Sequence, residues 1–196
     1  NFSALLPVMF ITVPFFSSLK QLFLDRDLIQ GLRDKYIKNG DSSENRVLWF
    51  TDTIDDLNGV AVNLQNYMRT VHQRDMNVKF VVCRNENAGT MPFVNTINLP
   101  RIFSYTPDFY NTYTLNIPSL LKSVDMIYKY APEEIIISTP GPVGIIGLLM
   151  AKLTGVKCTG IFHTDFSYQA EMILEDEGIA SFVQTYLYWF YSFTDE

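Results

Sequence analysis

From residue 46 onward, short apolar runs alternate with segments of helical periodicity, and this alternation constrains the fold more than any other feature. The short runs are rich in β-branched and aromatic residues, as buried strands are; they lie at 46–51, 78–83, 134–138 and 156–162. Alternating strands and helices form βαβ units around a parallel sheet. The sequence therefore predicts an α/β fold, with a Rossmann-like, mainly parallel sheet and helices on both faces.

The segments between these runs predict helices, because their apolar residues recur every three or four positions. Pro118 is placed at a helix start, where proline is tolerated, and Gly155 just after a helix end, where glycine is favoured. Residues 85–118 are expected to form short strands and loops. We expect helices at 60–71, 118–131, 144–153 and 179–193. The helix at 118–131 should bury Leu120, Leu121, Val124, Ile127 and Tyr128. The helix at 179–193 has one aromatic stripe, formed by Phe182, Tyr186, Trp189, Phe190 and Phe193.

Residues 1–45 are assigned to an N-terminal extension or to the end of a preceding domain. Residues 1–19 carry no charge and approach the length of a membrane-spanning helix, but two prolines interrupt them. Two interpretations stay open, a buried segment of a preceding domain or a membrane-facing anchor. An amphipathic helix is expected at 18–38 and a polar linker at 41–45. Residues 46–196 then form the Rossmann-like domain.

The charge balance disfavours one class of partner. Fifteen basic and twenty-one acidic residues give a net charge of −6, so no overall basic field would hold a nucleic acid. The two cysteines, Cys83 and Cys158, lie within apolar runs and are expected to be buried free thiols. This cysteine usage fits a reducing compartment. Two thiols alone do not complete a four-ligand zinc site.

Three loops are candidates for a ligand site, because open parallel sheets bind ligands beyond the carboxyl ends of their strands. The loops lie at 51–59, 139–144 and 163–166, and each comes directly after an expected strand. In the first, Asn58 and Gly59 directly precede a helix whose N-terminal amides could face an anion; an ordinary strand-to-helix turn explains the pair equally well. The acidic residues of this first loop suit capping of the following helix better than binding of a metal, and no metal is expected.

The other two loops also leave alternatives open. Gly141 and Gly144 lie in a turn with two prolines, which either brings its backbone to a ligand or lets the next helix pack closely on the sheet. His163 follows an apolar run, where its imidazole could contact a ligand or serve a structural role. His72, near the end of a helix, is interpreted as a surface residue.

Taken together, the loops resemble one known family. The segments that carry the likeness are 51–53, 58–60, 138–144 and 162–166, in this order, with a Tyr-x-x-Trp-Phe-x-x-x-Thr-Asp run at 186–195. They resemble the N-terminal half of a group-1 (family four) GT-B glycosyltransferase, and within it the mannosyltransferase and sulfoquinovosyltransferase-like branch. The likeness covers roughly residues 46–196.

This resemblance implies a two-domain enzyme that transfers a sugar from a nucleotide-diphosphate donor to a lipid or glycan hydroxyl, with retention of configuration and without a metal or further cofactor. It implies that Asn58 and Gly59 lie against the donor diphosphate and that His163 contacts the transferred sugar near the reacting centre. The family's nucleotide-sugar-binding C-terminal domain has no counterpart here, so the chain alone is expected to be inactive. The residues expected to line the cleft are Asp52, Gly141, Gly144, Thr164 and Asp165.

Other functions are kept as alternatives. The first is a non-catalytic sugar- or lipid-interacting module of the same fold. A nucleotide-dependent oxidoreductase is weaker, because the first strand-to-helix turn lacks the Gly-x-Gly-x-x-Gly spacing. A metal-dependent hydrolase ranks last for want of ligands. The expected location is cytoplasmic, and the family's lipid acceptors suggest peripheral contact with the inner face of the membrane.

Overall fold

The computed structural model describes residues 12–21, 28, 45–55, 59–85, 95–106, 114–163, 172 and 177–196. The chain divides into two units, Asn1–Glu44 with Lys152–Gly155, and Asn45–Ala151 with Val156–Glu196.

In the first unit, residues 12–21 are helical, and the Ser18 hydroxyl donates to the Pro14 carbonyl oxygen at 2.8 Å. Within the described residues, no helix has the length and apolar content that crossing a membrane requires. Most of the helix expected at 18–38, and all but the last residue of the linker expected at 41–45, lie outside the described residues. The assignment of residues 1–45 to a separate segment stays a prediction.

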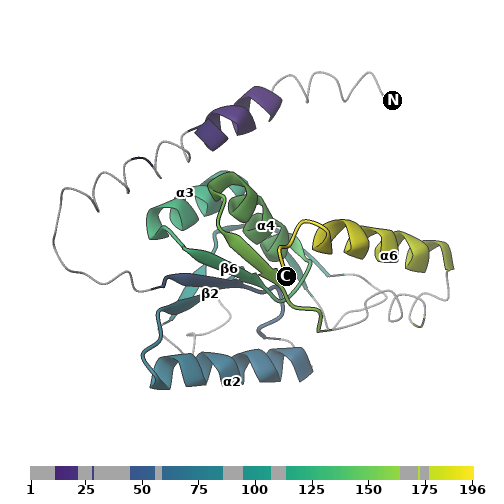
Figure 1. The fold of residues 1–196 in the computed structure, drawn as a ribbon. Coiled ribbons are helices and arrows are strands. Elements are labelled where there is room, and N and C mark those ends of the chain that lie inside the picture. Colours follow the sequence, from purple (N-terminus) through teal and green to yellow (C-terminus); the bar gives the residue numbers. More distant parts are fainter. Residues whose placement is uncertain are drawn as a thin grey trace. The chain divides into compact units, whose positions relative to one another are not determined.

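The second unit is built on a five-stranded parallel sheet, which confirms the α/β class (Figure 1). In spatial order the strands are β3 (Thr96–Asn98), β2 (Val78–Val82), β1 (Val47–Phe50), β6 (Glu134–Ile137) and β7 (Lys157–Gly160). All four pairings between neighbours are parallel. The chain therefore builds outward from β1 in one direction, and then crosses to the other side of β1 to add β6 and β7. The order reverses between β1 and β6.

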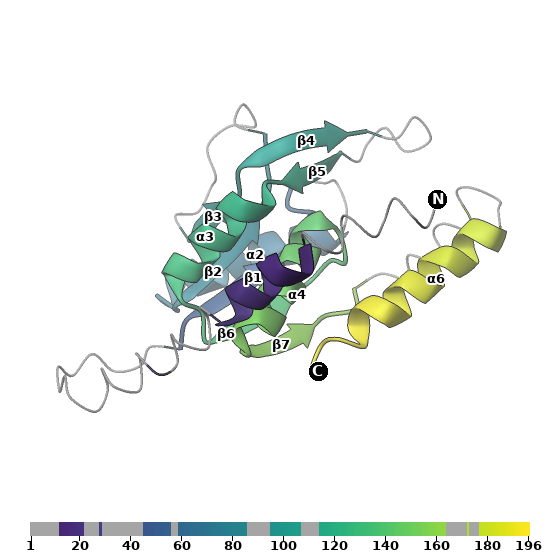
Figure 2. The same cartoon turned by 90° about the horizontal axis from the view of Figure 1, so that it is seen from above.

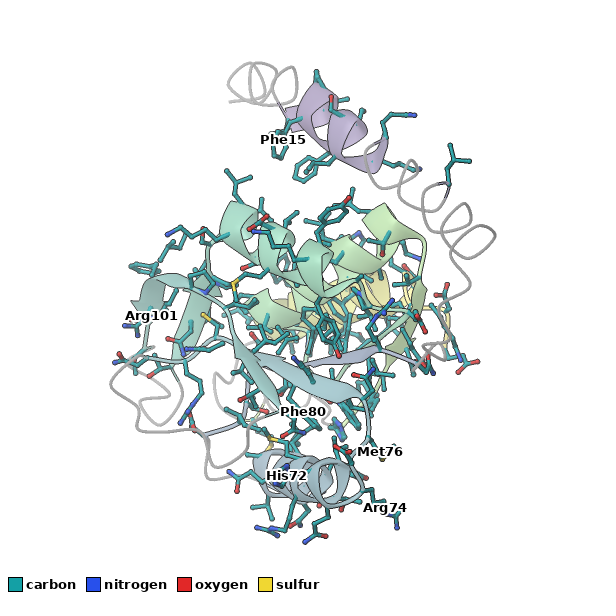
Figure 3. All side chains as sticks on the ribbon, turned by 90° about the vertical axis from the view of Figure 1, so that its left-hand side faces the viewer. Phe15, His72, Arg74, Met76, Phe80 and Arg101 are labelled. Carbon is teal, nitrogen blue, oxygen red and sulfur yellow. The ribbon has the colours of Figure 1, made fainter. Side chains whose placement is uncertain are left out.

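Helices cover both faces of this sheet, as expected. Figures 1 and 3 show α2 (Gly59–Gln73) on one face, and α3 (Leu120–Tyr130) and α4 (Pro142–Thr154) on the other. The remaining helix, α6 (Glu177–Tyr191), follows β7 in the chain. His72 lies exposed in the last turn of α2, in agreement with its interpretation as a surface residue.

The side chains of β1 show why both faces need cover. Val47 belongs to the buried cluster that includes Leu64 and Met68 of α2, and the partly buried Trp49 packs against it. Leu48 and Phe50 alternate with these two residues and are fully buried. A Cβ on Gly147 of α4 would lie 2.8 Å from the Phe50 ring, so the absence of a side chain lets this helix approach the sheet. Strands buried on both faces have continuous apolar sequences, and this is why the short runs predicted them correctly. Cys83 and Cys158 are buried free thiols, as predicted.

A second sheet corrects one prediction. β4 (Arg101–Tyr105) and β5 (Leu115–Pro118) pair antiparallel as a two-stranded sheet (Figure 2). Pro118 is the last residue of β5 and does not begin a helix. α3 starts after Ser119 at Leu120. Proline fits both places, the first turn of a helix and the end of an edge strand, so the residue type alone did not distinguish them.

The buried faces of two helices are narrower than predicted. On α3, Val124 and Ile127 are buried, whereas Leu121 and Tyr128 are exposed. On α6, Phe190 is fully buried but other aromatic residues of the predicted stripe are partly or largely exposed. Helical periodicity indicates which residues share a face, but does not show how wide the contact with the core is.

Candidate functional site

The three candidate loops leave the same edge of the parallel sheet. They follow β1, β6 and β7, which are neighbours in the sheet and run in the same direction. The first two loops flank the position at which the strand order reverses. In open α/β sheets this is the position at which ligands bind.

Asp52 joins the first two loops. Its carboxylate accepts hydrogen bonds from the Thr139 hydroxyl and the Val143 amide, both at 2.8 Å, and from the Gly144 amide at 3.4 Å. The Asp52 amide in turn donates to the Thr139 hydroxyl at 2.7 Å. The carboxylate thus lies at the N-terminus of α4, where free amides and the helix dipole favour an anion.

Close neighbours leave no room for a side chain at either glycine of the second loop. A Cβ on Gly141 would lie 2.5 Å from the carboxylate carbon of Asp52, and one on Gly144 would lie 1.9 Å from the Thr139 carbonyl oxygen. Glycine is required at both positions if Asp52 is to bind the helix end and the turn is to keep its path. Their expected part in lining a cleft stays a prediction.

Burial dominates the electrostatics of Asp52. It raises the pKa of the carboxyl group to about 6, although the hydrogen bonds from Val143, Thr139 and Gly144 pull the pKa down. The same carboxylate acts on its neighbours. Burial first, and the Asp52 charge second, raise the pKa of Cys83 to about 11 and that of Tyr186 to about 12. Both groups therefore stay protonated near neutral pH.

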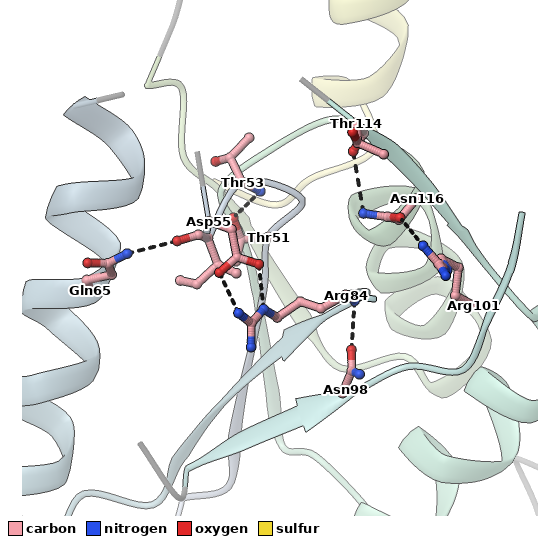
Figure 4. A network of polar contacts seen from close by, with 10 residues as sticks. Thr51, Thr53, Asp55, Gln65, Arg84, Asn98, Arg101, Thr114 and Asn116 are labelled. Carbon is pink, nitrogen blue, oxygen red and sulfur yellow. Dashed lines mark hydrogen bonds and ion pairs between the residues drawn. The ribbon is translucent and has the colours of Figure 1, made fainter. Parts of the chain in front are cut away.

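The other described acid of the first loop, Asp55, pairs with a cation that lies two residues after the end of β2. Its two carboxylate oxygens accept from Nε and Nη2 of Arg84 at 2.5 and 2.7 Å (Figure 4). The Arg84 amide donates to the Asn98 side chain, and on the other side the Gln65 side chain of α2 donates to the Ile54 carbonyl oxygen. Both described acids are thus engaged by the chain itself. Within the described ranges, no group of three or more His, Cys, Asp or Glu side chains could hold a metal ion.

Gly59 begins α2 beside this loop. Apart from its chain neighbours and the backbone of its own helix, no atom of the described residues lies within 4 Å of the position that a Cβ would take, so their packing does not require glycine here. An open approach to the first amides of a helix is what a phosphate group needs. Asn58, predicted beside it, lies outside the described residues.

His163 lies three residues after the end of β7. Its Nε2 atom is buried and has no hydrogen-bond partner among the described residues. Burial lowers the pKa of the imidazole below its usual value, so the ring is mainly neutral at pH 7. Thr164 and Asp165 lie outside the described residues. The structure therefore leaves the roles of all three as predictions.

A groove of about 500 Å³ lies beside this third loop. Phe162, the residue before His163, lines it together with residues of α6 and the C-terminal segment. None of the predicted site residues belongs to its wall. The lining residues are Gly160, Phe162, Gln184, Leu187, Tyr188, Tyr191, Thr194 and Glu196.

Sequence reasoning gave no part in holding the loops together to three residues that have one. Thr139 bonds Asp52, Arg84 bonds Asp55, and the hydroxyl of Tyr186 donates to the Pro140 carbonyl oxygen. One signal for Arg84 was available, since it stands just beyond a predicted strand, at the same sheet edge as the acids. Thr139 belonged to a candidate loop and Tyr186 to an expected aromatic stripe, but nothing in the sequence indicated the bonds that they form.

Comparison of the chain with models of known protein families, with curated proteins and with solved structures finds no match.

Proposed function

We propose that this chain is the acceptor-side half of a retaining glycosyltransferase, which acts on a nucleotide-diphosphate sugar and on a lipid or glycan hydroxyl. The observation that supports this most is the common origin of the three loops. The loops after β1 and β6 flank the reversal of strand order, and the loop with His163 follows the adjacent strand. This is the ligand-binding edge of an open α/β sheet.

The donor diphosphate would bind at the start of α2. A phosphate oxygen would approach the backbone there because Gly59 has no side chain and, outside its own helix and chain neighbours, no described residue lies within 4 Å of its Cβ position. An exposed helix end contributes only about 0.3–1 kcal/mol to the binding of a charge. Most of the affinity for the nucleotide would therefore come from a second domain, as in the family that the loops resemble.

His163 would contact the transferred sugar. A neutral imidazole offers one donor and one acceptor, and adds no positive charge where an oxocarbenium-like charge develops. Its lowered pKa and its Nε2 atom, which has no partner among the described residues, are both consistent with this role.

Asp52 would act by positioning. Its carboxylate is already engaged by the segment between β6 and α4, and so fixes the first two loops to one another. A departing diphosphate and a sugar cation gain most from dipoles that are already in place before reaction.

Turnover tests the proposal. Chain 1–196 alone should transfer no sugar, whereas the longer polypeptide that contains the nucleotide-binding half should do so with retention. In that polypeptide, His163→Ala should lower kcat at least about 100-fold without changing Tm. His72→Ala is the matched control, because this histidine is exposed on α2, and it should leave kcat unchanged.

Two results would contradict the proposal. Turnover by chain 1–196 alone would remove the need for a second domain, and unchanged kcat in the His163→Ala variant would remove this histidine from the site. Sugar binding without any turnover in the longer polypeptide would favour the non-catalytic module.

A further inference from the structure

Helix α6 contacts both the second and the third candidate loop through two tyrosine side chains. The hydroxyl of Tyr186 donates to the Pro140 carbonyl oxygen in the second loop. Tyr191, near the end of β7, contacts the chain just before His163 (Figure 2). Since Asp52 already joins the first loop to the second, α6 connects the loop of His163 to the other two.

Tyr191 packs on the three residues that directly precede His163. A Cβ on Gly160 would lie 3.0 Å from its ring. Its hydroxyl donates to the Ile161 carbonyl oxygen at 3.4 Å, and its ring meets the Phe162 ring edge to face, with centroids 5.7 Å apart. Because three successive residues contact this one side chain, Tyr191 fixes the path by which the chain reaches His163.

Tyr186 is itself held in place by its own helix. Its ring stacks on Trp189 with centroids 5.9 Å apart and contacts Phe190 at 6.1 Å. Phe190 is fully buried and anchors α6 in the core of the domain. Burial, and secondly the charge of Asp52, raise the pKa of the Tyr186 hydroxyl to about 12, so the hydroxyl remains a donor near neutral pH.

Pro140 lies between two residues that contact Asp52. On one side the Thr139 hydroxyl donates to the Asp52 carboxylate at 2.8 Å. On the other side the Cβ position of Gly141 lies 2.5 Å from the same carboxylate. A shift of the second loop at Pro140 would therefore move Asp52 and the first loop with it. The bond from Tyr186 opposes such a shift, since losing it would leave a partly buried carbonyl without this donor.

We propose that Tyr186 and Tyr191 are positioning residues of the ligand site, which align the loop of His163 with the two loops that Asp52 joins. The inference rests on the proposed function, because it requires one nucleotide-diphosphate sugar to contact both the start of α2 and His163. In this role both tyrosines act through the backbone of their own chain. A catalytic group displaced by about 1 Å can lower the rate about 100-fold. Loss of alignment should therefore affect the chemical step more than the binding of the diphosphate.

An NMR titration of chain 1–196 with GDP-mannose or UDP-glucose tests the alignment without requiring turnover. In the wild type, the Gly59 amide and the His163 ring should shift with a single dissociation constant. In Tyr186→Phe, which removes only the hydroxyl, the dissociation constant at Gly59 should stay within about twofold, whereas the shift of the His163 ring should be lost. Tyr188→Phe is the matched control, because Tyr188 is 72% exposed on the same helix, and it should behave as the wild type.

Tyr191→Leu is a second variant, which acts from the third loop. It removes the ring contacts with Gly160 and Phe162 and leaves the bond from Tyr186 to the second loop in place. The shift of the His163 ring should be lost here too, while Gly59 still reports binding. In the longer polypeptide, Tyr186→Phe should lower kcat at least about tenfold and leave the KM for the nucleotide sugar within about twofold.

The outcomes separate this inference from the proposed function. If the wild type binds and both variants keep the shift of the His163 ring, or if kcat is unchanged in Tyr186→Phe, the inference is overturned and the proposed function stands. An equal loss of the shifts at Gly59 and His163 would also overturn it, because it would show a general loss of structure. A wild type without saturable shifts would contradict the proposed function, and the inference with it.

Discussion

Replacing Asp52 by asparagine should change how the stability of the protein depends on pH. Burial raises the pKa of this carboxyl group from its ordinary value of 3.8 to about 6. A raised pKa means that the folded state binds the proton more tightly than the unfolded state does. The stabilisation is therefore fully present below pH 3.8 and is lost as the pH rises through 6.

The magnitude follows from the shift. A difference of about 2 pKa units, at 1.36 kcal/mol per unit, corresponds to about 3 kcal/mol. The Asp52→Asn variant has no titrating group at this position. The free energy of unfolding of the wild type relative to this variant should therefore fall by about 3 kcal/mol between pH 3.8 and pH 7. Urea unfolding followed by circular dichroism at several pH values measures this difference.

A suitable control is Asp125→Asn, since Asp125 forms an exposed ion pair with Lys129 on α3. Exposed pairs contribute little, so the difference from the wild type should stay within about 0.5 kcal/mol across the range. The opposite sign at Asp52 would refute the reasoning. If the wild type gains stability over the Asp52→Asn variant as the pH rises, then the hydrogen bonds from the start of α4 outweigh burial and the pKa is depressed.

Three further predictions concern the other loop residues. Gly144→Ala should destabilise the fold by at least about 3 kcal/mol in chemical denaturation, because its Cβ would overlap the Thr139 carbonyl oxygen; a loss under about 1 kcal/mol would mean that the turn moves freely. Gly59→Ala should leave the stability equal or slightly raised, since nothing lies near the added methyl group; if the diphosphate site is real, it should still weaken binding of a nucleotide sugar, measured by calorimetry. Titration of His163 by NMR should give a pKa below that of a free imidazole, and a value above it would show that a nearby anion outweighs burial.

The sequence predicted the sheet better than the connections. Strands such as β1 and β6 are short apolar runs buried on both faces, and such runs are recognisable without knowledge of their neighbours. Gly155 was correctly placed after the end of α4, and its φ of +70° explains why glycine occurs there. Pro118 was misplaced because its position depends on whether β4 is available as a partner, which is a tertiary fact.

The sequence predicted where the candidate site lies, but not the hydrogen bonds that join its loops. The position of the loops follows from the direction of parallel strands. The bond between Asp52 and Thr139 joins residues 87 positions apart, and nothing in the sequence near either residue indicates it. The width of the buried face of α6 was also hidden, because Phe182 and Phe190 are equally apolar but only Phe190 meets the core.

The most direct test of the account is to map where a nucleotide-diphosphate sugar binds on chain 1–196. An amide ¹⁵N–¹H NMR titration, with GDP-mannose or UDP-glucose up to about 5 mM, covers the weak affinity expected of one half. The account predicts that the amides of Gly59 and Val60, at the start of α2, and the ring of His163 shift together with a single dissociation constant. Shifts confined to other elements, or no saturable shift at all, would contradict the claim that these loops form one ligand site.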